Sequence, residues 1–135
     1  THVLSHSLHY GSGVFEGIRC YQNPETKKSY VFRLRDHMER LHRSCKISLI
    51  DLPYSVDELC DATIELIRKN KLPSCYIRPI VYRGYGVMGV DPTGAPTDVA
   101  MAVGHLPGRR CARQRRGRGR VVVAPAYEQL HSACG

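Results

Sequence analysis

The stretch His9-Tyr10-Gly11-Ser12-Gly13-Val14-Phe15-Glu16-Gly17-Ile18-Arg19-Cys20-Tyr21 is the most informative part of this sequence. Its glycines interrupt regular structure and permit backbone angles and close approaches that a Cβ would block. In an extended chain, Gly17, Arg19 and Tyr21 share one face, and Ile18 and Cys20 point to the other. An arginine and a tyrosine beside bare backbone suit a small carboxylate-bearing ligand. On spacing alone, an ordinary strand after a glycine-rich turn is the better interpretation.

The next segment predicts a hairpin and two helices. Residues 23–28 are a polar turn sequence, and residues 29–34 alternate as a strand does. A helix over 36–46 is indicated by an apolar stripe of Leu34, Met38, Leu41 and Cys45. Arg40 borders this stripe, so its guanidinium either reaches into a cleft or is solvated while its stem packs on apolar surface. A second helix begins with a capping box, formed by Ser55 and Glu58, and continues with the apolar positions Leu59, Ala62, Thr63, Leu66 and Ile67.

Residues 73–84 predict a strand with the same chemistry as the first one. Tyr76 and Arg78 share one face of it, which again places a phenol and a guanidinium side by side. Pro79 cannot donate to a neighbouring strand, so the strand is expected to be an edge or to be irregular at that point. A short apolar strand follows at 98–103.

Together these elements predict an α+β domain over residues 1–103, with an antiparallel-rich sheet and two packed helices. Residues 104–135 follow a different pattern, rich in arginine and glycine and without periodicity. We expect this tail to be irregular or disordered.

Charge and hydropathy narrow the functional classes. The formal net charge is +8, but residues 108–135 hold seven of the 20 basic residues and one of the 12 acidic residues. The basicity therefore belongs to the tail, and the near-neutral body argues against specific nucleic-acid binding. Apolar runs long enough to cross a membrane are absent from the sequence, so no membrane partner is expected.

The cysteines and histidines argue for a cytoplasmic protein without a metal site. None of the six cysteines forms a CxxC pair, which favours reduced thiols over a disulfide framework. His2, His6 and His9 could share a helical face, but the stretch is short and has no carboxylate or cysteine beside it. We expect structural histidines there and no bound metal.

Three motifs, in order, resemble those of branched-chain amino acid aminotransferases, which are class IV, fold-type IV enzymes that use pyridoxal 5'-phosphate. They are Tyr10-Gly11 with Val14-Phe15-Glu16-Gly17-Ile18-Arg19-Cys20-Tyr21, then Phe32-Arg33 with His37-Met38-Glu39-Arg40-Leu41, and finally Tyr76-Ile77-Arg78-Pro79 with Tyr82-Arg83-Gly84-Tyr85-Gly86 and Met88-Gly89-Val90-Asp91-Pro92. A single motif is weak, whereas the ordered set is specific. The implied fold is the small domain of such an enzyme.

The resemblance implies a role for each matching residue. Arg40 matches the arginine that holds the cofactor phosphate, and we expect Arg40, Arg19, Tyr76 and Arg78 to converge on one cleft that binds anions. The substrate-binding positions are matched by Tyr10, Phe15, Gly17, Arg19, Tyr76, Arg78 and Val90. Phe15 and Gly17 line the side-chain pocket, and Tyr76 bonds the substrate α-carboxylate. Tyr10 and Val90 match residues that reach a neighbouring subunit, which implies a homodimer or larger homo-oligomer.

The implied reaction is amino-group exchange between leucine, isoleucine or valine and 2-oxoglutarate, giving branched-chain 2-oxo acids and glutamate, in branched-chain amino acid biosynthesis. It requires a Schiff-base lysine, which the family carries in its larger domain. Here the last lysine is Lys71, so no catalytic residue is assigned and the chain alone is expected to be inactive.

The tail does not continue the resemblance. Its arginine-rich sequence is typical of GC-rich DNA read out of frame, and we hypothesise a frameshift between Val103 and Gly108.

Three alternatives for the function of this chain stay open: a D-amino acid aminotransferase, a relative of aminodeoxychorismate lyase, and a nucleic-acid binder acting through the arginine/glycine tail.

Overall fold

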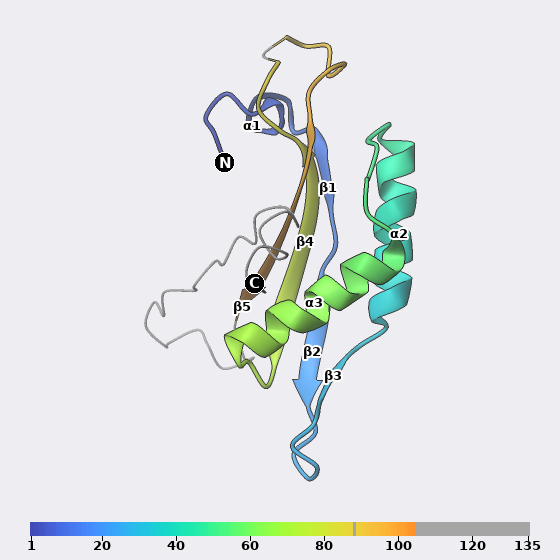
Figure 1. Cartoon of the computed structure of the whole chain (residues 1–135), viewed down its shortest axis with the longest axis vertical. Helices are drawn as coiled ribbons and strands as arrows, with labels where there is room; N and C mark the ends of the chain where they lie inside the picture. Colours follow the sequence, from blue (N-terminus) through green and yellow to red (C-terminus); the bar gives the residue numbers. More distant parts are fainter. Residues whose placement is uncertain (88, 105–135) are drawn as a thin grey trace, which may run out of the picture.

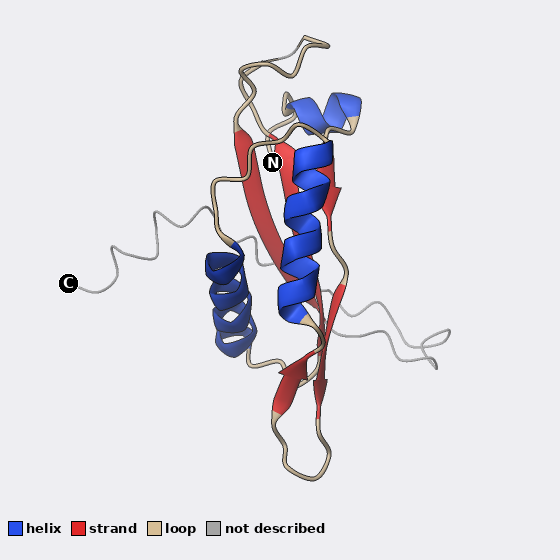
Figure 2. Ribbon diagram, turned by 90° about the vertical axis from the view of Figure 1, so that its right-hand side faces the viewer, coloured by secondary structure: helices blue, strands red, loops and turns tan. Residues whose placement is uncertain are grey.

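The computed structural model describes residues 1–87 and 89–104. A single sheet carries two longer helices against one face (Figure 1), and the quarter-turned view shows one of them in front of the strands and the other to its left (Figure 2). The elements are α1 His6–Tyr10, β1 Gly13–Phe15, β2 Ile18–Gln22, β3 Ser29–Val31, α2 Leu34–Ile47, α3 Val56–Asn70, β4 Cys75–Arg83 and β5 Thr97–Gly104. The predicted α+β class is confirmed.

Strand β4 is the centre of the sheet. It pairs antiparallel with β1 and β2 along one edge and with β5 along the other, and β3 pairs with the outer side of β2. The register on β4 runs unchanged from β1 into β2, so these two short strands follow one another and are separated only by Glu16 and Gly17. The hairpin predicted downstream of Tyr21 is the β2–β3 pair.

Pro79 explains why β1 and β2 are separate strands. The Glu16 N–H donates to the Pro79 carbonyl at 3.0 Å, but a proline has no N–H to complete the reciprocal bond. Of the two alternatives expected for Pro79, the irregular strand is therefore correct and the edge strand is wrong. The ladder is interrupted opposite Pro79, within the motif that carries the predicted site residues.

The core lies between the sheet and its two helices. Alternation along β2 and β4 buries every second side chain on this side, as the sequence pattern predicted. The buried apolar side chains of this core are Ile18, Cys20, Met38, Leu41, Cys45, Ile50, Leu59, Leu66, Ile67, Cys75, Ile77, Val81, Met101 and Val103. The two longer helices do not contribute to the opposite face, and five of the seven predicted substrate residues alternate onto that face: Phe15, Gly17, Arg19, Tyr76 and Arg78.

Helix α2 begins earlier than the sequence period suggested. Strand β3 ends at Val31, not at Leu34, because Arg33 adopts a left-handed conformation (φ 49°, ψ 42°) that turns the chain into the helix. Arg33 also forms an ion pair with Asp36 in the first turn. The buried positions Met38, Leu41 and Cys45 are those predicted from the helical period.

Helix α3 has the capping box that its sequence predicts. The Ser55 side chain accepts from the Glu58 N–H at 3.2 Å, and the Glu58 carboxylate accepts from the Ser55 N–H at 2.8 Å. Both bonds satisfy donors that a helix N-terminus leaves unpaired. The carboxylate's bonds to Ser55 also lower the pKa of Glu58.

The three N-terminal histidines each have a separate partner. The His6 imidazole lies 2.6 Å from the Ser12 hydroxyl, His9 Nε2 lies 3.0 Å from the Val3 carbonyl, and the His2 ring packs on Tyr85. Only His6 and His9 belong to α1. Within residues 1–87 and 89–104, no three His, Cys, Asp or Glu side chains are grouped as metal ligands.

Four of the six cysteines fall in the described part of the chain. Cys20, Cys45 and Cys75 are buried, Cys60 is half-buried, and all four are free thiols, as expected. None of the helices in this part is long and apolar enough to cross a membrane. The predictions for the tail, including its disorder and the frameshift, concern residues outside the described range.

Candidate functional site

The face of the sheet opposite the helices gathers an arginine, a tyrosine and a phenylalanine. The Arg78 guanidinium donates to the Tyr76 hydroxyl at 2.5 Å, and both side chains come from β4. The guanidinium carbon of Arg78 also lies 4.4 Å from the centre of the Phe15 ring. This cation–π contact holds the arginine between two aromatic residues, with its charge beside an apolar surface. We call Phe15, Gly17, Arg19, Tyr76 and Arg78 the open-face cluster.

Arg19 extends this cluster onto β2. It is directly opposite Tyr76 in the β2–β4 register, and its Nη1 donates to the Tyr21 hydroxyl at 3.2 Å. This hydrogen bond to Tyr21 raises the pKa of Arg19, so the guanidinium is charged at any physiological pH. Two fixed positive charges with phenol hydroxyls beside them are an arrangement that binds carboxylates.

Gly17 provides the space that the cluster needs. A Cβ built at Gly17 would lie 2.6 Å from the Tyr76 hydroxyl oxygen, well inside van der Waals contact. Any larger residue would therefore displace Tyr76 or push it away from Arg78. The glycine is required by this close approach and not by an unusual backbone angle.

A second charged group lies on the helix side of the same strand segment. The buried Glu16 carboxylate, 3% exposed, accepts from Arg40 Nε at 2.5 Å and from Arg40 Nη2 at 2.6 Å. His37 Nδ1 lies 3.0 Å from the second carboxylate oxygen. The hydrogen bonds from Arg40 lower the pKa of Glu16 despite the opposing effect of burial.

The sequence predicted that Arg19, Arg40, Tyr76 and Arg78 converge on one cleft, and the structure corrects this in part. Arg19, Tyr76 and Arg78 share the open face, whereas the polar contacts of Arg40 are with Glu16 on the covered side. The difference follows from alternation, because Glu16 points away from its neighbours Phe15 and Gly17. Arg40 is thus joined to the cluster through Glu16, one of the two residues between β1 and β2.

Tyr10 and Val90 lie apart from the open-face cluster. Tyr10 ends α1, where its ring packs against His6 and His9, and Val90 lies in the 85–96 loop with 79% of its surface exposed. Their predicted contact with a neighbouring subunit stays a prediction.

Glu16 and His37 were not predicted as site residues, although the sequence contained a signal for Glu16. Its place in the alternation, between Phe15 and Gly17, puts a carboxylate at a core position. A buried carboxylate needs a partner, and the arginine that borders the apolar stripe of the following helix was the natural choice. His37 sits one turn before Arg40 on α2, so the same helix face supplies both partners.

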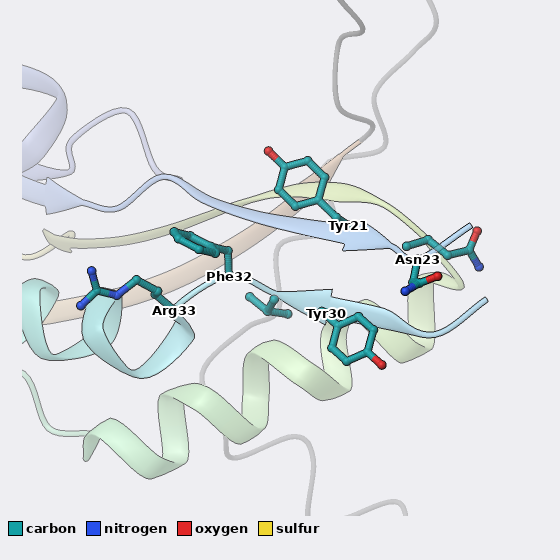
Figure 3. A pocket seen from close by; sticks show the side chains of 7 residues that line it. Tyr21, Asn23, Tyr30, Phe32 and Arg33 are labelled. Atoms are coloured by element: carbon teal, nitrogen blue, oxygen red, sulfur yellow. The ribbon is translucent and has the colours of Figure 1, made fainter. Parts of the chain in front are cut away.

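A shallow hollow of about 360 Å³ lies beside the β2–β3 hairpin. Figure 3 shows Tyr21, Tyr30 and Phe32 from the hairpin and Arg33 from the start of α2 around it. Tyr21 also accepts the hydrogen bond from Arg19, so the hollow adjoins the open-face cluster. Arg33 is engaged with Asp36, which leaves aromatic rings as the main lining.

These features define a small α+β domain in which one sheet face places two arginines beside aromatic rings. The chain belongs to the class IV aminotransferase family, whose model matches residues 13–131. The family resemblance and the fold inferred from the three motifs are confirmed.

Similar proteins are branched-chain aminotransferases. The chain is 53% identical over 102 residues to the branched-chain-amino-acid aminotransferase of Escherichia coli K12, and the match covers 75% of this chain and 32% of that protein. The crystal structure of the E. coli enzyme superposes with a TM-score of 0.71 at 51% identity, over 76% of this chain and 34% of that one. The Thermobaculum terrenum enzyme in its PLP-bound holo-form gives a TM-score of 0.67 at 32% identity, over 76% and 34%. This chain therefore spans about a third of the length of these relatives.

Proposed function

We propose that this chain forms the small domain of a branched-chain amino acid aminotransferase. The reaction exchanges the amino group of leucine, isoleucine or valine with 2-oxoglutarate in the cytoplasm, within a homodimer or larger homo-oligomer. The observation that carries the proposal is the open-face cluster, in which Arg78 is held between Phe15 and Tyr76. Such a site offers one apolar surface and fixed positive charges, and the alternating substrates of this reaction need both.

Within this proposal, the open-face cluster binds and orients the substrate. Tyr76 donates to its α-carboxylate, and Arg19 and Arg78 attract the carboxylates of the acidic partner, glutamate or 2-oxoglutarate. Phe15 and the bare backbone at Gly17 face the branched aliphatic side chain and exclude water from it. Because the carboxylate and the side chain of the substrate are both held, the carbon that bears the amino group is kept in the orientation that the reaction needs.

The residues present fit the phosphate of pyridoxal 5'-phosphate. The Arg40 side chain is 58% exposed, and its bonds to Glu16 use Nε and Nη2. Nη1 is left to donate to an anion, a task that a planar guanidinium performs well. When bound, the cofactor supplies the group that accepts and returns the amine.

The reaction requires a Schiff-base lysine. We propose that this lysine lies in the two thirds of the relatives' length that this chain does not match. The five lysines of this sequence lie in the β2–β3 loop, near the end of α2 and around the end of α3. None of them contributes a hydrogen bond or ion pair to the open-face cluster, and Lys69 is paired with Glu65. On this proposal the chain binds and orients, and the catalytic amine is supplied from elsewhere.

A chimera tests the proposal. Residues 1–104 replace the matched segment of the E. coli enzyme, so that the missing two thirds come from a 53% identical relative. The chimera is expected to transaminate leucine, isoleucine and valine with 2-oxoglutarate, and Arg78→Gln is expected to raise the KM for 2-oxoglutarate about tenfold or more. Preference for D-alanine over leucine would favour the D-amino acid alternative, and a folded chimera without either activity would overturn the proposal.

A further inference from the structure

Glu16 connects Arg40, on the covered side of the sheet, with the open-face cluster on the other side. It lies on the covered side of the sheet, with Phe15 and Gly17 of the open-face cluster as its chain neighbours. Its backbone is fixed by the bond to the Pro79 carbonyl, and its side chain is fixed by Arg40 and His37. Both ends of this residue are therefore immobilised, at a position for which the sequence predicted no role.

The pairing with Glu16 determines how Arg40 is presented. The two bonds run side by side from Nε and Nη2 to the two carboxylate oxygens, so the plane of the guanidinium is fixed by the plane of the carboxylate. An exposed arginine without such a partner samples many rotamers and must be ordered when a ligand binds. Here the folded protein already orders the Arg40 guanidinium through its two bonds to Glu16.

We propose that Glu16 is a positioning residue, whose carboxylate fixes the Arg40 guanidinium for the cofactor phosphate and ties it to the strand segment that borders the substrate. The inference rests on the proposed role of Arg40. His37 contributes by engaging the second oxygen of Glu16, which leaves the carboxylate little freedom to rotate. The phosphate end and the substrate end of the site are thereby linked through residues 15–17.

A simpler account is that Glu16 only offsets the charge of Arg40. The two accounts predict different results for two substitutions. If only charge matters, Glu16→Gln should strengthen anion binding and Glu16→Asp should leave it unchanged. If position matters, Glu16→Asp should weaken binding, because its carboxylate falls short by one C–C bond, about 1.5 Å, and cannot keep both bonds.

The test uses the 135-residue chain and inorganic phosphate as the probe. The Nε–H signal of Arg40 is observed by ¹⁵N NMR and assigned by its loss in Arg40→Lys. We expect this proton to exchange with solvent about tenfold faster in Glu16→Asp and Glu16→Gln than in the wild type. We also expect phosphate to shift the Arg40 signal with an affinity about threefold or more weaker in Glu16→Asp. Glu25→Gln removes an exposed carboxylate in the β2–β3 loop and serves as the matched control.

The outcomes separate this inference from the proposed function. Wild-type exchange and wild-type phosphate affinity in Glu16→Asp would overturn the inference alone. A wild-type Arg40 signal that phosphate does not shift would overturn the phosphate role of Arg40, and with it this inference. If Glu16→Gln does not fold, Glu16→Asp decides the question, since it keeps the charge and denaturant unfolding reports its folded state.

Discussion

At the scale of single residues, Gly17 is a position where an added side chain would disturb the open-face cluster directly. The Cβ of Gly17→Ala would meet the Tyr76 hydroxyl at 2.6 Å, so Tyr76 must move and its bond to Arg78 is lost. In the chimera we expect kcat/KM for leucine to fall about tenfold or more, with little change in unfolding free energy because the site is on an open face. Gly104→Ala, where a Cβ meets nothing within 4 Å, is the control. Equal effects of the two substitutions would contradict the close approach.

The thiols give a second prediction at this scale. Burial raises the pKa of Cys75 to about 11 from its ordinary 9.0, and burial also raises the pKa of Cys60, which is half-buried. Because the thiolate is the reactive form, a rise from 9 to 11 leaves about a hundredfold less of it at pH 8. We expect iodoacetamide to label Cys60 before Cys75 in the folded chain, as read by peptide mass mapping. Unfolding in urea should remove the difference, and faster labelling of Cys75 would show that its burial is wrong.

At the scale of elements, the capping box of α3 makes the clearest prediction. Ser55→Ala removes the acceptor for the Glu58 N–H and the hydroxyl that donates to the Glu58 carboxylate, and it keeps only the bond from the backbone N–H of residue 55. We expect the free energy of unfolding to fall by about 1 kcal/mol, measured by urea denaturation of the whole chain. Ser44→Ala lies inside α2 and should be neutral or slightly stabilising, since alanine has the higher helix propensity. A loss as large at Ser44 would indicate a general cost of removing serines.

The elements also show which features a sequence can predict. The stripes of α2 and α3 and the alternation of β2 and β4 follow from local periods, and these predictions were correct. The place of β4 in the sheet depends on which strands meet it, and a local pattern carries no such information. For Pro79 the sequence therefore left an edge strand and an irregular strand as alternatives, and the second is correct, because Pro79 lies in the central strand and interrupts the ladder between β1 and β2. Similarly, the left-handed turn at Arg33 ended β3 earlier than its alternation suggested.

At the scale of the whole molecule, local sequence patterns again do not show which elements meet, and this explains why the candidate site was predicted only in part. Residues on one strand face could be grouped from alternation, so the sequence correctly placed Gly17 with Arg19 and Tyr76 with Arg78. Whether Arg40 reaches that face depends on how α2 packs, and the helix lies on the opposite side of the sheet. The sequence could have indicated Glu16 as its partner, because an acid at a buried strand position must be paired.

The link between sheet and helix through Glu16 makes the stability of the whole domain depend on pH. Bonds from Arg40 lower the pKa of Glu16 in the folded chain below its ordinary 4.5. Stability from this pair is therefore complete above about pH 4.5 and is lost as the pH falls through the lowered value. We expect wild-type unfolding free energy to exceed that of Glu16→Gln by on the order of 2 kcal/mol at about pH 7, a figure already reduced for the exposure of Arg40. The difference should shrink as the pH falls below 4.5.

Urea midpoints measured across this range test the dependence. Glu58 and Asp91 also have lowered pKa values, but both are present in wild type and variant, so their contributions cancel in the difference. Glu25→Gln should show no such trend, because it removes an exposed acid of the β2–β3 loop. A difference between wild type and Glu16→Gln that stays constant across the whole range would mean that the charge of Glu16 does not stabilise the fold. In that case α2 would be held on the sheet by apolar packing alone, and Arg40 would be free to take another orientation.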